Sequence, residues 1–272
     1  MIERRLGGLS IREWGEPDAP GILLWPGLGA NAAYFAAIAE SLPGRAVAVD
    51  PPGVGNSAPI DRNRRDRYAE LARAAIDASG CRAMVGHSLG GYVALDVAVQ
   101  PPLPLRAVVL IDGGFLKMQE LGQLGMPIEE GRAALTEWLE ANDPRVPDWE
   151  SAVSALSRML GAEPNSTITA YVHEVFAEAG GEIRSAVAPV QLADLLLAIV
   201  NDAPAGVVKI PTLLIACGQP AESRSIRQAA WERLAATSPL IELHVVEEWS
   251  HNPALQAPQG LAAVITGWLQ DK

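Results

Sequence analysis

Short, almost wholly apolar runs recur along the chain and alternate with segments in which apolar residues return every three or four positions. Runs this apolar are typical of parallel strands that are covered on both faces, because neither face alternates with polar residues. The three-and-four spacing is typical of amphipathic helices. The strand-like runs are residues 21–27, 45–53, 82–88, 106–114, 210–218 and 241–249, and the helical segments between them include 31–42, 67–80, 89–100 and 225–236.

This alternation of strands and helices predicts the fold class. Strand, helix and strand in succession build parallel sheets with helices on both faces. Two weaker strands, near residues 2–6 and 9–14, predict an antiparallel start, and residues 258–270 predict a closing helix. We therefore expect an α/β protein with a doubly wound, mostly parallel eight-stranded sheet and flanking helices.

One interval, residues 115–205, lacks strong strands and predicts helices instead. Its helical pieces are residues 131–143, 149–161, 167–180 and 190–202. A long helical insertion between two strands of a sheet is typical of a lid over an active site. We expect residues 1–114 and 206–272 to form the α/β core, with 115–205 as a helical lid between strands six and seven. The alternative is a second helical domain without a role in catalysis.

Charge and composition exclude some classes of binding partner. The net charge of −11 disfavours nucleic acid, because an acidic protein repels a phosphate backbone. No apolar run approaches the roughly 18 residues of a membrane span, and the charged N-terminus lacks the apolar core of a signal peptide. We expect a cytoplasmic protein that binds neither nucleic acid nor membrane. Cys81 and Cys217 lie in or beside apolar runs and predict buried free thiols, and the charge run 61–67 predicts a solvated loop or helix face.

The stretch with the clearest chemistry is Gly86-His87-Ser88-Leu89-Gly90, which fits G-x-S-x-G between a predicted strand and a predicted helix. Such a turn holds the serine in a strained backbone conformation at the start of a helix, with only small neighbours to leave room. The alternative is a tight turn that needed small residues. In this context Ser88 is our candidate nucleophile, and a serine nucleophile needs a base.

The chain offers only four histidines for that base. His87 adjoins the serine, and adjacent side chains on such a turn diverge. His173 lies in the expected lid, and His244 lies within a predicted strand. His251 follows the last strand in a polar loop, at the carboxyl edge of the sheet where α/β sites are built. We therefore expect His251 to be the base.

Several motifs together resemble the α/β-hydrolase fold superfamily, in its serine-nucleophile, esterase- or lactonase-like branch with a helical lid. Residues 25–30 (WPGLGA) resemble the family's His-Gly-x-Gly turn, with Pro26 where histidine is usual. Residues 50–57 (DPPGVGNS) resemble a further family turn, and residues 86–91 (GHSLGG) its nucleophile elbow. The segment SHNP stands at the family's Gly-His loop, with Ser250 in place of glycine. The resemblance extends over essentially the whole chain.

The resemblance implies an oxyanion hole made of the backbone N–H groups of Leu28 and Leu89. Most family members carry the acid of the triad just after strand seven, but here that region reads LLIACGQPAESRS, and Glu222 is its only carboxylate. Asp112 ends strand six, 24 residues after Ser88. Some branches, including haloalkane and fluoroacetate dehalogenases and a zearalenone lactonase group, place their acid there. We favour Asp112 as the acid and keep Glu222 as the alternative.

These residues predict hydrolysis of a carboxylic ester or lactone through an acyl-enzyme, with a small-molecule substrate and no metal or organic cofactor. Other reactions of the same triad stay open (thioester or C–C bond hydrolysis, perhydrolysis, acyl transfer), as does a non-catalytic ligand-binding protein. The sequence leaves monomer or homodimer undetermined. An apolar lid suggests a hydrophobic substrate, and the candidate pocket residues are Phe115, Leu116, Met118, Trp138 and Tyr171, with Trp149 and Phe176 as further lid aromatics.

Overall fold

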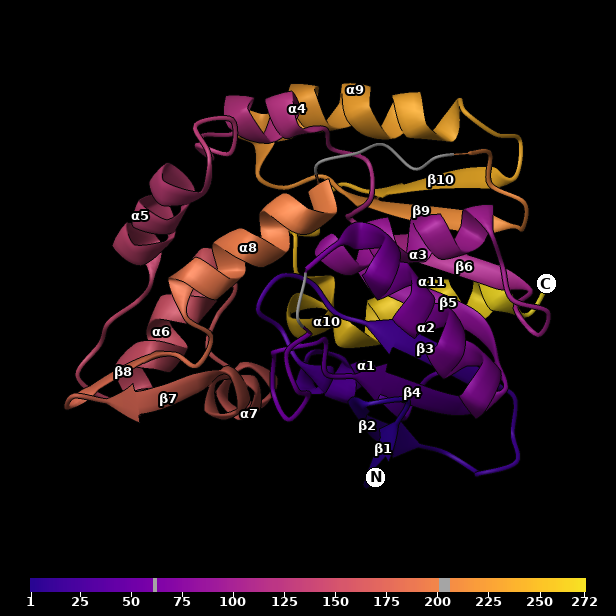
Figure 1. Cartoon of the computed structure of the whole chain (residues 1–272), viewed down its shortest axis with the longest axis horizontal. Helices are drawn as coiled ribbons and strands as arrows, with labels where there is room; N and C mark the ends of the chain where they lie inside the picture. Colours follow the sequence, from indigo (N-terminus) through magenta and orange to yellow (C-terminus); the bar gives the residue numbers. More distant parts are fainter. Residues whose placement is uncertain (61–62, 201–205) are drawn as a thin grey trace.

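In the computed structural model, which describes residues 1–60, 63–200 and 206–272, one eight-stranded sheet forms the centre of the molecule (Figure 1). The strand order is β1-β2-β4-β3-β5-β6-β9-β10. Only the β1–β2 and β2–β4 pairs are antiparallel, which confirms the predicted mostly parallel sheet with an antiparallel start. The strands are β1 (Ile2–Leu6), β2 (Leu9–Trp14), β3 (Gly21–Trp25), β4 (Arg45–Val49), β5 (Cys81–His87), β6 (Ala107–Ile111), β9 (Thr212–Cys217) and β10 (Ile241–Val246).

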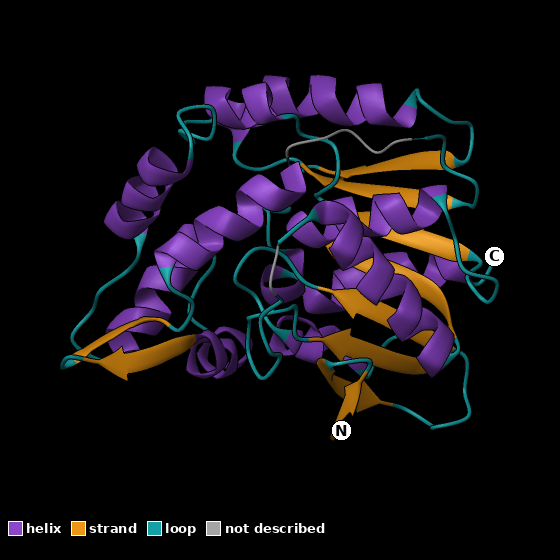
Figure 2. Ribbon diagram, in the orientation of Figure 1, coloured by secondary structure: helices purple, strands orange, loops and turns teal. Residues whose placement is uncertain are grey.

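Helices cover both faces of this sheet, as the apolar strands predict (Figure 2). Alternate residues of β3 belong to opposite buried clusters, since Leu23 and Trp25 lie in one and Ile22 and Leu24 in the other. Each face therefore has its own core. Helices α2 (Arg65–Ser79), α3 (Leu89–Val99) and α9 (Arg224–Ala235) contribute to the first cluster, and the 3-10 helix η1 (Ala32–Phe35), α1 (Ala36–Ala39), α10 (Pro253–Gln256) and α11 (Pro258–Leu269) to the second.

A segment inserted between β6 and β9 lies to one side of the sheet, with α5 to α8 on the left of Figure 1. Its side chains join both cores, so it packs as part of the same molecule. Residues 201–205, at the end of the expected lid, and the last two residues of the expected helix 190–202 lie outside the described residues. The helices are α4 (Met118–Gln123), α5 (Arg132–Asn142), α6 (Trp149–Leu160), α7 (Ser166–Val175) and α8 (Pro189–Val200).

The expected helix over residues 167–180 is wrong in its second half. Helix α7 ends at Val175, and the chain then forms a hairpin of β7 (Phe176–Ala179) and β8 (Glu182–Ser185). The two residues between these strands, Gly180 and Gly181, have φ values of 68° and 83°. A two-residue hairpin turn with positive φ at both positions favours glycine, and this Gly-Gly pair ends the helix in favour of the hairpin.

The charge run 61–67 is also not the fully solvated segment that its composition predicts. Arg65 is buried and donates from Nε and Nη2 to the two carboxylate oxygens of Asp96, at 2.6 and 2.8 Å. It lies three and four positions before Tyr68 and Ala69, on the buried stripe of α2. Arg64 and Arg67 are exposed, as expected, and residues 61–62 are not described.

Two other sequence expectations concern the cysteines and a membrane span. Cys81 and Cys217 are free and buried, as predicted, and burial raises the pKa of Cys81 to about 11. In the described part of the chain, no helix combines the length and apolar character that a membrane span needs.

The central strands should carry much of the stability. Leu23 in β3 is fully buried, so we expect Leu23→Ala to lower the free energy of unfolding by about 2–5 kcal/mol through lost burial and the cavity left behind. Leu103→Ala is the matched control, because that leucine is 93% exposed and should change the stability by less than about 0.5 kcal/mol. Chemical denaturation of the two variants measures both values. Equal losses would contradict this account of the core.

Candidate functional site

Three polar side chains meet at the carboxyl edge of the sheet. Ser88 follows β5, Asp112 follows β6, and His251 lies in the loop after β10. Backbone hydrogen bonds extend the sheet to this edge, from Ser88 N–H to the Ile111 carbonyl (2.9 Å) and from Asp112 N–H to the Ile215 carbonyl (2.8 Å). Parallel strands end at one edge, so residues that are 24 and 139 positions apart become neighbours.

Hydrogen bonds join the three side chains in a line. His251 Nε2 lies 2.8 Å from Ser88 Oγ, and His251 Nδ1 lies 2.7 Å from Asp112 Oδ2. A carboxylate only accepts, so Nδ1–H donates to Asp112 and Nε2 is left to accept the Ser88 hydroxyl. The Asp112 side chain is 2% exposed, whereas His251 is 47% exposed. One end of the line is therefore buried and the other open to a substrate.

The turn at Ser88 is strained and tightly packed. Ser88 has φ 51° and ψ −115°, a conformation that side chains other than glycine rarely adopt, and Asp112 also has a positive φ of 41°. A Cβ at Gly86 would collide with the Gly90 carbonyl, and one at Gly90 would collide with the Trp25 carbonyl. The glycines around Ser88 are thus required by close backbone approach.

The two candidate oxyanion donors lie in front of this turn. Leu28 follows β3 and Leu89 begins α3, and both line one small cavity together with Gly27 and Gly90. Residues at the start of a helix have backbone N–H groups without a partner within the helix, so Leu89 N–H is free of intrahelical bonds. Leu28 and Leu89 therefore remain predicted oxyanion donors.

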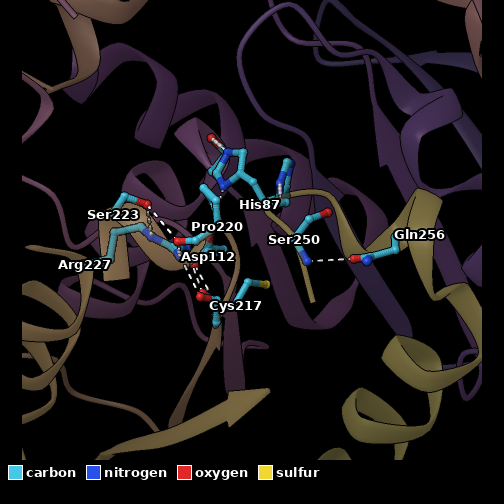
Figure 3. A network of polar contacts seen from close by, with 11 residues as sticks. His87, Asp112, Cys217, Pro220, Ser223, Arg227, Ser250 and Gln256 are labelled. Carbon is cyan, nitrogen blue, oxygen red and sulfur yellow. Dashed lines mark hydrogen bonds and ion pairs between the residues drawn. The ribbon is translucent and has the colours of Figure 1, made fainter. Parts of the chain in front are cut away.

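The Asp112 carboxylate has two further neighbours besides His251. Cys217 N–H donates to its Oδ1 (3.1 Å), and Nη1 of Arg227 lies 3.7 Å from its Oδ2 (Figure 3). Sequence reasoning missed Arg227, although a signal was present. Arg227 precedes Ala230, Trp231 and Leu234 by three, four and seven positions, which places it on the buried stripe of α9.

Glu222, the alternative acid, lies elsewhere. It belongs to the exposed 3-10 helix η2 (Ala221–Ser223). Within the described residues no hydrogen bond or ion pair joins Glu222 to His251, whereas Asp112 accepts a hydrogen bond from the His251 ring.

His87 contacts the site from behind. Its Nε2 donates to the backbone carbonyl of His251 (2.8 Å), and its ring stacks on Tyr34 with centroids 4.4 Å apart. Burial, and then repulsion from His251, lower the pKa of His87 well below its ordinary 6.5, although the bond to the His251 carbonyl opposes this. The sequence suggests for His87 only the role of a base, which its place beside Ser88 disfavours. Its contact with His251 instead gives it a part in holding that loop.

The candidate pocket residues fall into two groups. Phe115 is buried edge-to-face against Trp231, with ring centroids 6.2 Å apart, and Tyr171 is buried edge-on to Tyr34 at 5.9 Å. Trp149 packs against His173 within the insertion, with the two rings tilted by 34°, and Phe176 begins β7. The other three candidates are half-buried and retain surface for a ligand: Leu116, Met118 and Trp138.

The described residues contain no group of three or more His, Cys, Asp or Glu side chains that could hold a metal ion.

The two candidate acids can be separated by substitution. We expect Asp112→Asn to lower kcat on a p-nitrophenyl ester by on the order of 10³-fold or more, since an amide cannot stabilise a charged His251. Glu222→Gln serves as the matched control and should leave kcat nearly unchanged. Thermal unfolding checks that both variants are folded. A large loss for Glu222→Gln with little loss for Asp112→Asn would assign the acid to Glu222.

The buried His87 should make stability depend on pH. Its folded pKa is below its unfolded value of about 6.5, so the unfolded state binds the proton first. Above pH 6.5 His87 is neutral in both states and does not oppose folding. As the pH falls below 6.5, the unfolded state is protonated first, and the free energy of unfolding decreases by up to about 1.4 kcal/mol per pH unit.

His87→Phe keeps a ring against Tyr34 and removes this titration. We expect its free energy of unfolding to decline less than that of the wild type between pH 6.5 and 5, as measured by denaturation at each pH. If the free energy of unfolding falls equally with pH in the two proteins, His87 is not the source of the pH dependence.

Comparisons with known proteins add to this geometry. Residues 22–264 match the family model described as "Alpha/beta hydrolase family". A stretch of 104 residues is 34% identical to the Klebsiella pneumoniae protein named "Putative carbamate hydrolase RutD", covering 36% of this chain and 39% of that one. A stretch of 73 residues is 36% identical to a Pseudomonas 2-hydroxy-6-oxononadienedioate/2-hydroxy-6-oxononatrienedioate hydrolase, covering 26% of each. The matches thus cover well under half of these relatives.

Solved structures are similar to this chain over nearly its whole length. The structure of E-2-(acetamidomethylene)succinate hydrolase superimposes with a TM-score of 0.78 and covers 99% of both chains. Its sequence identity of 21% makes this a likeness of fold alone.

Proposed function

Because the chain belongs to the alpha/beta hydrolase family, we propose that it hydrolyses a carboxylic ester or lactone of a small to medium, hydrophobic substrate through an acyl-enzyme on Ser88. The observation that carries this proposal is the line of hydrogen bonds from Ser88 Oγ through His251 to Asp112, at 2.8 and 2.7 Å. A serine hydroxyl, a neutral imidazole and a buried carboxylate in this order form a nucleophile, its base and the group that orients the base.

Each step of the proposed reaction has a residue in this line or beside it. His251 Nε2 removes the Ser88 proton as Oγ attacks the carbonyl carbon, and the Leu28 and Leu89 N–H groups bind the oxyanion. The tetrahedral intermediate collapses, the C–O bond to the alcohol breaks, and His251 returns the proton to the leaving oxygen. Water, deprotonated by His251, then attacks the acyl-enzyme and releases the acid and Ser88. Asp112 keeps Nδ1 protonated throughout and stabilises the imidazolium.

The inserted segment is proposed as the lid of this site. Core residues 1–114 and 206–272 carry the three reacting side chains, and residues 115–205 lie between β6 and β9 in the chain. Tyr171 of α7 packs on Tyr34, which stacks on His87, so the insertion is in contact with the structure behind His251. The half-buried Leu116, Met118 and Trp138 are the proposed contacts for an apolar substrate.

Related reactions use the same line of residues. The names of two partial relatives refer to a carbamate hydrolase and to a 2-hydroxy-6-oxononadienedioate hydrolase. Carbamates, and diketones cleaved at a C–C bond, are therefore the second class to test. In both, the nucleophile and oxyanion donors keep their proposed roles. A carbamate carries nitrogen on the attacked carbonyl, and a diketone loses a carbon leaving group that takes up a proton at carbon.

A substrate panel tests the proposal directly. We expect wild-type protein to hydrolyse one or more p-nitrophenyl esters, lactones or thioesters of a panel that also contains carbamates and diketones, and Ser88→Ala to lose at least about 10³-fold of that activity. Ser41→Ala, which changes an exposed serine, is the matched control and should behave as wild type. Cleavage of carbamates or diketones with no cleavage of esters would replace the ester assignment.

A fluorophosphonate probe separates an enzyme from a binding protein. The probe should label Ser88 in folded wild-type protein, as mass spectrometry of the peptide will show, and should not label His251→Ala. An unlabelled Ser88 in folded protein contradicts every reaction that begins at this serine.

A further inference from the structure

A buried guanidinium from α9 contacts the turn after β9, where most members of the family carry the acid. Arg227 lies on α9 with its side chain 6% exposed. Nη1 donates to the Cys217 carbonyl (2.7 Å), and Nη2 donates to the carbonyls of Gly218 and Pro220 (3.1 Å each). Nε donates to Ser223 Oγ (3.1 Å). The guanidinium is therefore fixed in orientation by four hydrogen bonds (Figure 3).

In this orientation Nη1 of the guanidinium lies 3.7 Å from Asp112 Oδ2, the same oxygen that accepts from His251 Nδ1. The same turn also supplies the Cys217 N–H that donates to Asp112 Oδ1. Arg227 thus fixes the turn by donating to the carbonyl groups of the turn. Arg227 and the Cys217 N–H of the turn both contact the Asp112 carboxylate. Asp112 Oδ2 therefore accepts from His251 and also lies near the positive charge of Arg227, while Oδ1 accepts from Cys217 N–H.

Arg227 is the one charged partner of this carboxylate among the described groups that pack around it. Burial raises the pKa of Tyr34 well above 10 and also raises that of Cys217, and it lowers that of His87, so all three stay neutral near pH 7. On the outer side of the His251 loop, Glu247 is already paired with Arg224.

We propose that Arg227 is a positioning residue of the triad, whose buried charge keeps Asp112 ionised while His251 is neutral and limits how strongly Asp112 draws a proton onto His251. The physical reason is the cost of burial. A carboxylate that is 2% exposed needs a compensating charge, and a neutral imidazole supplies none. Without Arg227, the Asp112–His251 pair would gain that charge by binding a proton, and His251 would no longer be free to act as a base.

This inference rests on the proposed function only in taking His251 as the base, and it can be tested without any substrate. Titration of the His251 ring, followed by NMR of protein labelled with ¹³C at histidine Cε1, reports its protonation directly. Histidine signals are assigned from single substitutions of the other three histidines.

We expect Arg227→Met, which keeps length and removes charge, to raise the midpoint of the His251 titration by about 0.5–1 pH unit. The acid limb of kcat/KM on a cleaved ester should move upward by the same amount. Arg227→Lys keeps the charge and should stay within about 0.3 unit of wild type, although it loses several carbonyl contacts and should unfold at a lower temperature.

Arg224→Met is the matched control. Arg224 lies on the same helix, changes the net charge equally and stacks on the same Trp231 ring, but its ion pair is with Glu247. It should leave the midpoint unchanged. Equal midpoints in folded Arg227→Met and wild type would overturn the inference and leave Arg227 a role in stability alone.

The inference can still be tested if Arg227→Met does not fold. If Arg227→Met does not fold, Arg227→Gln takes its place with the same expected rise. If neither neutral variant folds while Arg227→Lys does, the charge is a requirement of the fold and the inference is overturned. The absence of cleavage across the whole ester, lactone and thioester panel would count against the proposed function, but the ring titration would still decide the role of Arg227.

Discussion

The candidate site depends on the burial of one carboxylate. Asp112 is almost fully removed from water, and an isolated charge in that position would be strongly unfavourable. Three groups from separate elements compensate it: the His251 ring, the Cys217 N–H and the Arg227 guanidinium. Each of these groups is in turn held by the backbone of β9, β10 or the turns that follow them. The positions of β9, β10 and the turns after them are therefore coupled to the negative charge of Asp112.

The same edge places the serine under steric constraint. Ser88 takes a positive φ on a turn where β5 and α3 approach so closely that Gly86 and Gly90 admit no side chain. The adjacent His87 donates to the backbone carbonyl of His251. Two consecutive residues of one turn thus serve opposite ends of the histidine: Ser88 meets its ring, and His87 holds its backbone.

The insertion between β6 and β9 is integrated with the core through aromatic contacts and ion pairs. Tyr171 meets Tyr34, and Glu174 on the same helix accepts from Arg12 of β2 at 2.7 Å. Asn31 also donates to the Glu174 carbonyl. These contacts join α7 to the part of the core that flanks His87. A substrate that enters between the insertion and the core would therefore be bounded by groups already linked to the site.

The sequence by itself determined the sheet, its two covered faces and the pairing of Ser88 with His251, because apolar runs, a G-x-S-x-G turn and chain order are local or sequential properties. It narrowed the acid to Asp112 or Glu222 without deciding their distances to His251. Tertiary structure decided that question of proximity, since only the sheet order brings β6 between β5 and β9. It also revealed Arg65 and Arg227 as buried cations and the hairpin after α7. A charged residue on an apolar stripe is visible in the sequence, but its partner, Asp96 or Asp112, becomes visible only when strands and helices distant in the chain are packed together.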